Sequence, residues 1–348
     1  VMPKAVKLAD IAQKLDVSTV TVSKALSGQK GVSEEMRAKI KQLAQEMGYV
    51  KTEASDRQKE KKSYTIGVAV AERYIGSNQP FYWQLYQELS QRSVRKNCFA
   101  VLEVIPYEME IRMLMPKMVT EEKIEAMILM GTFKMEYTHF LQQNVRLPFL
   151  MLDTLSHEGE VDTIVSNNLM GAYRMCNYLF ELGHKKIGFV GTRLATTSID
   201  ERFLGYLKSA MEHGMQIQNE WLVEDRDRDT GRSDYRTHYC LPDQNMPTAF
   251  FCNNDIAANV WIHKLTENGY SVPEDISVVG FDNYMNEPFA KIGITTYAID
   301  TKKMAKRAIH VLLHKLENAD YSMGICLIDG TFIERESACR IGPPVPFL

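Results

Sequence analysis

The chain has 348 residues, of which 45% are hydrophobic, so it is long enough for two or three domains with substantial cores. No apolar run reaches the roughly 18–20 residues of a membrane-spanning helix, and the N-terminus lacks the apolar region of a signal peptide. The six cysteines are scattered and none forms a C-x-x-C pair, which predicts reduced thiols in a cytoplasmic protein. We expect no metal site and no cofactor.

Charge is divided unevenly along the chain. Residues 1–62 hold 13 Lys and Arg against 8 Asp and Glu, a net +5, whereas the remainder holds 28 against 36, a net −8. A basic N-terminal segment ahead of an acidic body is typical of a nucleic-acid-binding head, although ordinary fluctuation in composition also produces such a split.

Residues 8–26 contain two short helical patterns separated at Asp16. Leu8, Ile11, Ala12 and Leu15 recur at helical spacing and predict one apolar face. Ser18 is placed to cap the second helix, whose inward side chains are Val22, Ala25 and Leu26. The outward positions are small, polar or basic, as suits a helix in a major groove: Ser18, Thr19, Val20, Thr21, Ser23 and Lys24. This pattern predicts a helix-turn-helix DNA-binding motif, but periodicity alone fits a generic helical hairpin equally well.

A third helix is predicted from about Ser33, its cap, to Met47, with Gly48 ending it. Residues 51–62 lack any large apolar side chain, which predicts a solvated linker. We therefore expect a DNA-binding domain at 1–50, a linker at 51–63 and a larger body at 64–348.

The body shows apolar strand-like runs that alternate with helical runs of about 10–16 residues. The first set of strands is expected at 65–71, 99–105, 126–130 and 148–153, and the second at 186–191, 248–253 and 277–282. Such strands indicate parallel sheets covered on both faces, here two doubly wound lobes. Ligands of these sheets bind beyond the carboxyl ends of the strands, which places a site in the cleft between the lobes.

Several spaced motifs resemble one family of bacterial transcription regulators, the LacI/GalR family. In the head they are A-D-I-A at 9–12, V-S-x-x-T-V-S at 17–23, A-L-S-G at 25–28 and M-G-Y at 47–49. In the body they include F-E-L-G-H-K-K-I-G-F-V-G at 180–191 and V-P-E-D-I-S-V-V-G-F-D-N at 272–283. The resemblance spans essentially the whole chain. It implies a DNA-binding dimer whose body is similar to periplasmic sugar-binding proteins.

Candidate ligand contacts lie where predicted strands end or helices begin. The resemblance implies a ligand-holding role for Arg202, whose alternative is a surface pair with Glu201. Asp282 is expected to accept sugar hydroxyls, the alternative being a helix cap. Of Asn254 and Asp255, we expect Asn254 to contact the ligand and the other residue to cap a helix. The remaining candidates are Phe81 and Tyr82, with Trp83 beside them, and Asp153 and Asn167.

Two segments, the loop at 225–229 and the linker, need separate interpretation. The charged run D-R-D-R-D at 225–229 is interpreted as a solvated loop, although a charged effector is the alternative. In the linker, Gln58 stands where the family carries a Leu that wedges into the minor groove, so we expect less DNA bending and a mainly electrostatic grip through Arg57, Lys59, Lys61 and Lys62. The C-terminal I-G-P-P-V-P-F-L is not a leucine-heptad tail, so we expect a dimer.

The predicted function is therefore a DNA-binding transcription regulator, a repressor, controlled by a sugar or sugar derivative bound between the lobes. The first alternative is a periplasmic-type sugar-binding protein without a DNA role, which the N-terminal helical segment opposes. The second is an enzyme on a doubly wound fold, such as a sugar kinase. No G-x-S-x-G, H-E-x-x-H or phosphate-binding P-loop occurs in the chain, so we expect no enzyme activity.

Overall fold

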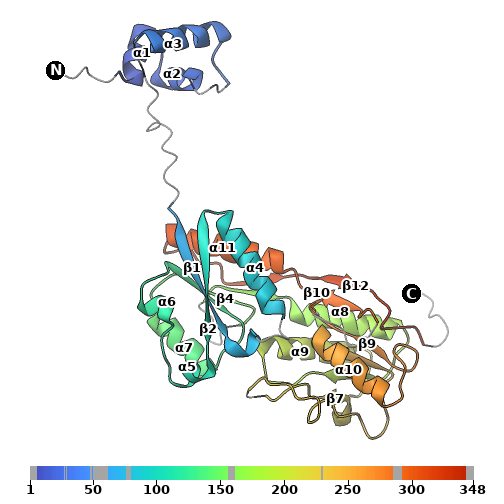
Figure 1. Ribbon diagram of the computed structural model, residues 1–348. Coiled ribbons are helices and arrows are strands. Elements are labelled where there is room, and N and C mark those ends of the chain that lie inside the picture. Colours follow the sequence, from blue (N-terminus) through green and yellow to red (C-terminus); the bar gives the residue numbers. More distant parts are fainter. Residues whose placement is uncertain are drawn as a thin grey trace. The chain divides into compact units, whose positions relative to one another are not determined.

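The computed structural model describes residues 6–26, 28, 30–47, 49, 62–75, 80–155, 161–228, 230–284 and 292–341. The chain divides into two compact units, Val1–Lys62 and Ser63–Leu348 (Figure 1). Most of the predicted linker, including Arg57, Gln58, Lys59 and Lys61, lies outside the described residues, as do Gly48 and the last seven residues. The three-part division at residues 50 and 63 therefore stays a prediction.

The first unit is a three-helix head. Its helices are α1 (Leu8–Lys14), α2 (Thr19–Leu26) and α3 (Glu34–Glu46). Ile11, Val22 and Ile40, one from each helix, are completely buried against one another. The Ser18 hydroxyl accepts the backbone N–H of Thr21 at 3.0 Å, and the Ser33 hydroxyl accepts that of Met36 at 3.3 Å. The predicted helices and both serine caps are confirmed.

The first lobe of the body is built on a six-stranded parallel sheet in the order β11-β5-β4-β3-β1-β2. Its strands are β1 (Tyr64–Ala71), β2 (Cys98–Ile105), β3 (Ala126–Met130), β4 (Phe149–Leu152), β5 (Thr163–Ser166) and β11 (Ile325–Ile328). Helices α4 (Pro80–Val94) and α11 (Thr301–Glu317) pack on one face, and α5 (Tyr107–Ile111), α6 (Lys117–Thr120) and α7 (Met135–Asn144) lie on the other (Figure 1).

The second lobe contains a four-stranded parallel sheet in the order β7-β6-β8-β9. Its strands are β6 (Ile187–Val190), β7 (Leu222–Val223), β8 (Ala249–Cys252) and β9 (Ser277–Val279). The accompanying helices are α8 (Asn168–Glu181), α9 (Thr197–Glu212) and α10 (Asp255–Glu267). An antiparallel pair, β10 (Thr296–Ala298) and β12 (Thr331–Ile333), completes the body together with the short helices η1 (Glu72–Tyr74) and η2 (Asn219–Trp221).

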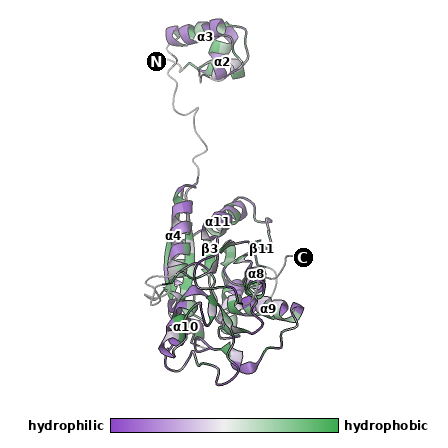
Figure 2. Ribbon diagram, turned by 90° about the vertical axis from the view of Figure 1, so that its right-hand side faces the viewer, coloured by the Kyte–Doolittle hydropathy of each residue, from purple (hydrophilic) through white to green (hydrophobic). Residues whose placement is uncertain are grey.

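The burial pattern explains why the strands read as continuous apolar runs. All residues of β3, β6 and β8 are buried, because helices cover both faces of each parallel sheet. The helices carry alternating hydrophilic and hydrophobic residues, as expected for amphipathic helices on a sheet (Figure 2). The fold class is confirmed, and so are the seven predicted strands. The short strands β5 and β7 and the strands β10, β11 and β12 are not among the seven predicted strands.

The strand order also positions a site. In the first lobe β1 lies between β2 and β3, and in the second β6 lies between β7 and β8. Where the strand order reverses in this way, the connections that follow two neighbouring strands run to opposite faces of the sheet. A crevice then opens between them at the carboxyl ends of the strands. In the part of the chain that the structure describes, no helix has the length and apolar character needed to cross a membrane.

Candidate functional site

The exposed face of α2 is the candidate DNA-binding surface. Val20 is 59% exposed, and Thr19, Ser23 and Lys24 are exposed beside it. Thr21 is only half-buried, and its hydroxyl hydrogen-bonds the Ser18 hydroxyl at 2.8 Å. The Ser18 and Thr21 hydroxyls therefore take part in capping the start of α2, although both belong to the candidate DNA-binding surface.

Helix α3 holds the far end of α2 in place. The Arg37 guanidinium donates to the carbonyl oxygens of Lys24 at 3.4 Å and Ala25 at 3.1 Å. A cation at a helix C-terminus satisfies carbonyls that the helix itself leaves unpaired. The candidate surface is thus fixed at both ends, by the Ser18 cap and by Arg37.

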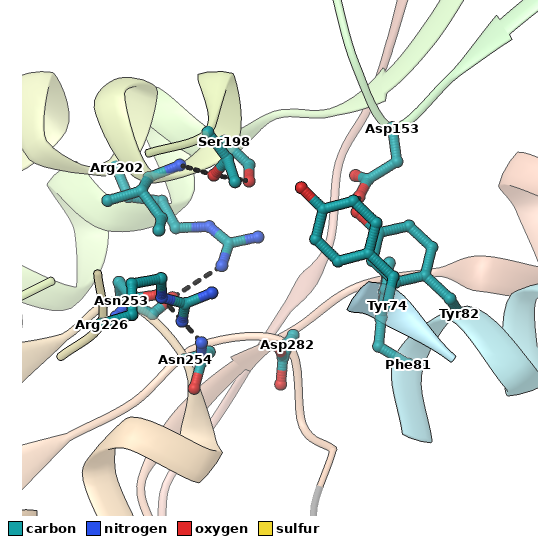
Figure 3. Close-up of a pocket in the computed structure, with 12 residues that line it drawn as sticks. Tyr74, Phe81, Tyr82, Asp153, Ser198, Arg202, Arg226, Asn253, Asn254 and Asp282 are labelled. Carbon is teal, nitrogen blue, oxygen red and sulfur yellow. Dashed lines mark hydrogen bonds between the residues drawn. The ribbon is translucent and has the colours of Figure 1, made fainter. Parts of the chain in front are cut away.

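A cavity of about 470 Å³, counting its open mouth, lies in the body between the two lobes (Figure 3). Figure 3 shows Arg202 and Arg226 reaching in from one side, with Tyr74, Tyr82 and Asp153 on the other. The lining residues come from both lobes: Tyr74, Phe81, Tyr82, Asp153, Thr196, Ser198, Ile199, Arg202, Arg226, Asn253, Asn254 and Asp282. Six of the seven candidate ligand contacts therefore line one cavity.

Arg202 lies in the second turn of α9 and is only 6% exposed. Its Nε donates to Oδ1 of Asn168 at 2.9 Å, and its Nη1 donates to the Asn253 carbonyl oxygen at 2.6 Å. The guanidinium carbon stands 4.1 Å from the ring centre of Phe281, a cation–π contact. Glu201 instead accepts a hydrogen bond from Asn168 at 2.8 Å. The Arg202 guanidinium is therefore held in place by Asn168 and Asn253. The alternative, a surface ion pair with Glu201, is wrong, because Arg202 is buried.

Asp225 and Arg226 form a buried ion pair beside it. Arg226 donates through Nε at 3.0 Å and Nη2 at 2.6 Å to Oδ2 of Asp225, which also accepts from Asn253 at 2.8 Å. The backbone N–H of Thr192 donates to Oδ1 at 2.9 Å. Burial by itself would raise the pKa of Asp225, but Arg226 and these hydrogen bonds hold it below its usual value. The interpretation of 225–229 as a solvated loop is wrong for these two residues, since a buried carboxylate fixes Arg226 at the cavity.

Asp282 closes the floor of the cavity from just beyond β9. Its backbone is in the left-handed region at φ 82°, a strained conformation that functional sites often retain. Its Oδ1 accepts the N–H of Tyr284 at 3.1 Å. Burial raises the pKa of Asp282 to about 7, although the nearby Arg202 opposes the shift.

Asn254 caps a helix and lines the cavity at once. Its Oδ1 accepts the N–H of Ala257 at 2.7 Å at the start of α10, and its Nδ2 donates to Asn253 at 2.9 Å. Asp255 is buried, with Oδ2 accepting the Thr296 hydroxyl at 3.0 Å. The expected cap is corrected, because Asn254 and not Asp255 caps α10, whereas the expected ligand contact of Asn254, which lines the cavity, stays a prediction.

The first-lobe wall is aromatic with one carboxylate. The Tyr82 hydroxyl donates to Oδ2 of Asp153 at 2.8 Å, and Phe81 packs edge-on against Tyr82 and Tyr284. Asp153 has φ 60° and is buried, and its Oδ1 has no hydrogen-bond partner among the described residues. Burial raises its pKa to about 6, against the lowering effects of Arg202 and Tyr82. An unpartnered buried acceptor facing a cavity suits a ligand hydroxyl.

Two candidates point elsewhere. Asn167 donates to Oδ1 of Asp329 at 2.7 Å and is not among the residues that line the cavity, whereas its neighbour Asn168 supports Arg202. Trp83 is 41% exposed and donates to the Ile75 carbonyl at 3.2 Å, so Phe81 and Tyr82 are the rings that face the cavity.

Sequence reasoning missed six lining residues: Tyr74, Thr196, Ser198, Ile199, Arg226 and Asn253. Each lies shortly after β1, β6, β7 or β8, at the carboxyl end of the strand. The same rule that selected Asp153 and Asp282 applies to them. Arg226 escaped because the two-residue β7 gives no recognisable strand signal.

The cavity combines fixed donors, acceptors and aromatic faces, the set of groups that binds a polyhydroxylated ring. Among the residues that the structure describes, no group of three or more His, Cys, Asp or Glu is placed to hold a metal ion.

Comparisons with known proteins agree on both units. A family model described as bacterial regulatory proteins, lacI family, matches residues 7–51, and one described as a periplasmic binding protein-like domain matches residues 176–338. The HTH-type transcriptional repressor PurR of Pectobacterium atrosepticum is 26% identical over 334 residues, covering 95% of this chain and 96% of its own.

Solved structures show the same fold. The lac repressor dimer bound to operator and the anti-inducer ONPF matches with a TM-score of 0.67 at 21% identity, over 97% of this chain and 100% of that one. The transcriptional regulator CelR–cellobiose complex matches with a TM-score of 0.68 at 19% identity, over 96% and 100%. Helix-turn-helix head, two-lobed body and repressor relatives coincide along one sequence. The chain thus joins a lacI-family helix-turn-helix domain to a periplasmic-binding-protein-like domain.

Proposed function

We propose that this protein represses transcription by binding an operator through α2, and that a sugar or sugar derivative in the inter-lobe cavity controls it. The observation that carries the proposal is the cavity itself, in which Arg202 and Asp282 of one lobe face Tyr82 and Asp153 of the other. A ligand that bridges the two walls favours one lobe arrangement over another, and this differential affinity is what shifts a population of conformations.

The DNA-binding role rests on the exposed face of α2. Val20 protrudes without a polar group, so it can contact a thymine methyl or exclude bulk but cannot pair with a base edge. We expect selection from randomised duplexes to return a near-palindromic site for the wild type and a different preferred base for Val20→Gln. A good base contact is worth about 1–3 kcal/mol of discrimination. Recovery of the same site by both proteins would contradict this assignment.

The effector class follows from the chemistry of the cavity. Asp153 and Asp282 accept hydroxyls, Arg202 donates, and Phe81 and Tyr82 supply faces for a ring. The CelR relative was solved in complex with cellobiose, which supports a carbohydrate here. A thermal-shift screen of sugars, sugar phosphates and nucleosides tests the class, because a ligand that binds only the native state raises stability by mass action. A response to nucleosides alone would contradict the proposal.

We infer a homodimer from the edge strand β2. Phe99 is 61% exposed and Val101 and Val104 are exposed on the same strand, an apolar edge that invites pairing with a second copy. The lac repressor match is a dimer, which supports this state. Sedimentation should find a dimer that Phe99→Glu shifts toward monomer, whereas Met211→Glu, at a 71% exposed apolar residue of α9, should leave it intact.

A DNA-binding regulator works where the chromosome is, so we place the protein in the cytoplasm. Family members are regulators rather than enzymes, and we propose no catalytic activity. A periplasmic-type sugar-binding protein would not need the helical head. The capped helices of this head suit a helix-turn-helix DNA-binding domain.

A further inference from the structure

A cluster of basic side chains lies on the first lobe, away from the cavity. It consists of Arg92 and Lys96 from α4 and the turn after it, and Arg307, His310 and His314 from α11. We call it the basic face. Residues 63–348 carry a net −8, so this concentration of cations runs against the charge of the body. The two helices pack directly against each other, which brings both sets of side chains together.

The basic face lies at the end of the sheet where the chain enters the body. Tyr64, the first residue of β1, pairs with Cys98, the first residue of β2, which follows Lys96 by two positions. The Lys315 ammonium, one residue after His314, donates to Asp162 at 2.6 Å just before β5 begins. Both helices therefore bring their last turns to the amino ends of the strands, the end of the sheet where β1 begins.

The cations of this face have few protein partners. The Nε atoms of Arg92 and Arg307 are buried without a hydrogen-bond acceptor among the described residues, and neither side chain pairs with a described carboxylate. Burial lowers the pKa of His310, and the positive charges of His314, Arg307, Lys96 and Arg92 lower it further. The side chains of Arg92, Lys96 and Arg307 therefore lie close enough to His310 to act on its charge. Gathering like charges costs free energy unless an anion is bound, so the arrangement is suited to a polyanion.

We propose that the basic face is a second DNA contact, which binds backbone phosphates independently of the base-reading helix α2. The inference rests on the proposed DNA-binding function and adds a surface to it. Phosphates of a duplex are closely spaced anions that Lys and Arg neutralise without regard to sequence. We favour DNA over an acidic protein because β1, which begins at this end of the sheet, is the first element of the body after the DNA-binding head in chain order.

The test uses the full-length protein and two duplexes, the selected operator and a random sequence of equal length. The variant is Arg92→Gln, Lys96→Gln and Arg307→Gln combined. The control removes the same charge at exposed positions elsewhere on the body, by Arg146→Gln, Arg236→Gln and Lys185→Gln. The single variant Lys96→Glu, at an exposed residue, guards against loss of folding in the triple variant. Affinity is measured from low to high salt.

We expect the triple variant to weaken binding to both duplexes alike and to flatten the slope of log affinity against log salt by up to about 0.9 per lost phosphate contact. Lys96→Glu should act in the same direction and the control should match the wild type. Unchanged slopes in the triple variant and in Lys96→Glu would overturn the proposal. So would unchanged DNA slopes with loss of binding to poly-L-glutamate, which would assign the face to an acidic protein. Failure of the wild type to bind either duplex would instead overturn the proposed function itself.

Discussion

The two walls of the cavity are built on different principles. On the second-lobe wall the charged groups are held by partners from within the lobe: Arg202 by Asn168 and Asn253, and Arg226 by Asp225. On the first-lobe wall, aromatic rings surround Asp153, one of whose oxygens has no partner among the described residues.

The difference indicates a division of labour. A preorganised network costs little further ordering when a ligand binds, so the second lobe provides a fixed template. The open acceptor of Asp153 is available for a hydrogen bond from a ligand that bridges the walls. Each prediction below perturbs one of the two walls.

The largest effect should come from the network of the fixed wall. Asp225→Ala leaves Arg226 as a buried cation without its partner, which we expect to cost about 3 kcal/mol or more in the free energy of unfolding. Urea denaturation measures it. Asp243→Asn, at an exposed carboxylate of the same lobe, should change stability little. Equal effects of the two substitutions would mean that the second-lobe wall is not a buried network.

Truncating Arg202 should weaken effector binding while leaving operator binding unchanged. Arg202→Ala removes the cationic donor that interacts electrostatically with Asp282 and Asp153 and should weaken effector affinity about 100-fold, or about 2.7 kcal/mol. Calorimetry with the sugar found in the screen measures it, and operator affinity without that sugar should stay near the wild-type value. Wild-type affinity for the sugar would show that Arg202 serves the fold alone.

The open wall should make the unliganded protein sensitive to pH. Asp153 has its pKa raised to about 6 in the folded state, above its unfolded value of about 3.9, so the folded state binds the proton more tightly. Its ionisation therefore destabilises the fold as pH rises from about 4 to about 6, by about 2–3 kcal/mol at most. Asp153→Asn should flatten this part of the stability profile. Asp243→Asn should leave the slope as in the wild type.

The smallest effect should come from removing the Tyr82 hydroxyl, which donates a hydrogen bond to Asp153. Tyr82→Phe removes one hydrogen bond to the carboxylate, worth about 1 kcal/mol, and keeps the ring. Because that bond favours the ionised form, its loss should move the pH at which Asp153 titrates upward. Carboxyl titration followed by NMR detects the shift, and movement in the opposite direction would contradict the geometry.

Local patterns predicted much of this molecule. Ser18 and Ser33 were placed as helix caps because a hydroxyl at that position satisfies an unpaired backbone N–H, and both do so. The apolar runs predicted the parallel strands, because burial on both faces leaves no polar alternation to confuse the pattern. Asp153, Arg202 and Asp282 were selected by their position at strand ends and helix starts, and all three line the cavity.

Tertiary structure alone decided which polar residues belong to the cavity. Asn167 and Asn168 are neighbours in sequence, yet one bonds Asp329 and the other supports Arg202, since successive residues at a helix start point in different directions. The charged run predicts a solvated loop at Arg226, but in the folded chain Arg226 is paired with the buried Asp225. The sequence by itself determined the helices of the head and seven of the strands, because these depend on local periodicity and capping. Only the folded chain determined the partners, because most of these hydrogen bonds join residues far apart in sequence, and the adjacent pair Asp225 and Arg226 is buried only in the fold.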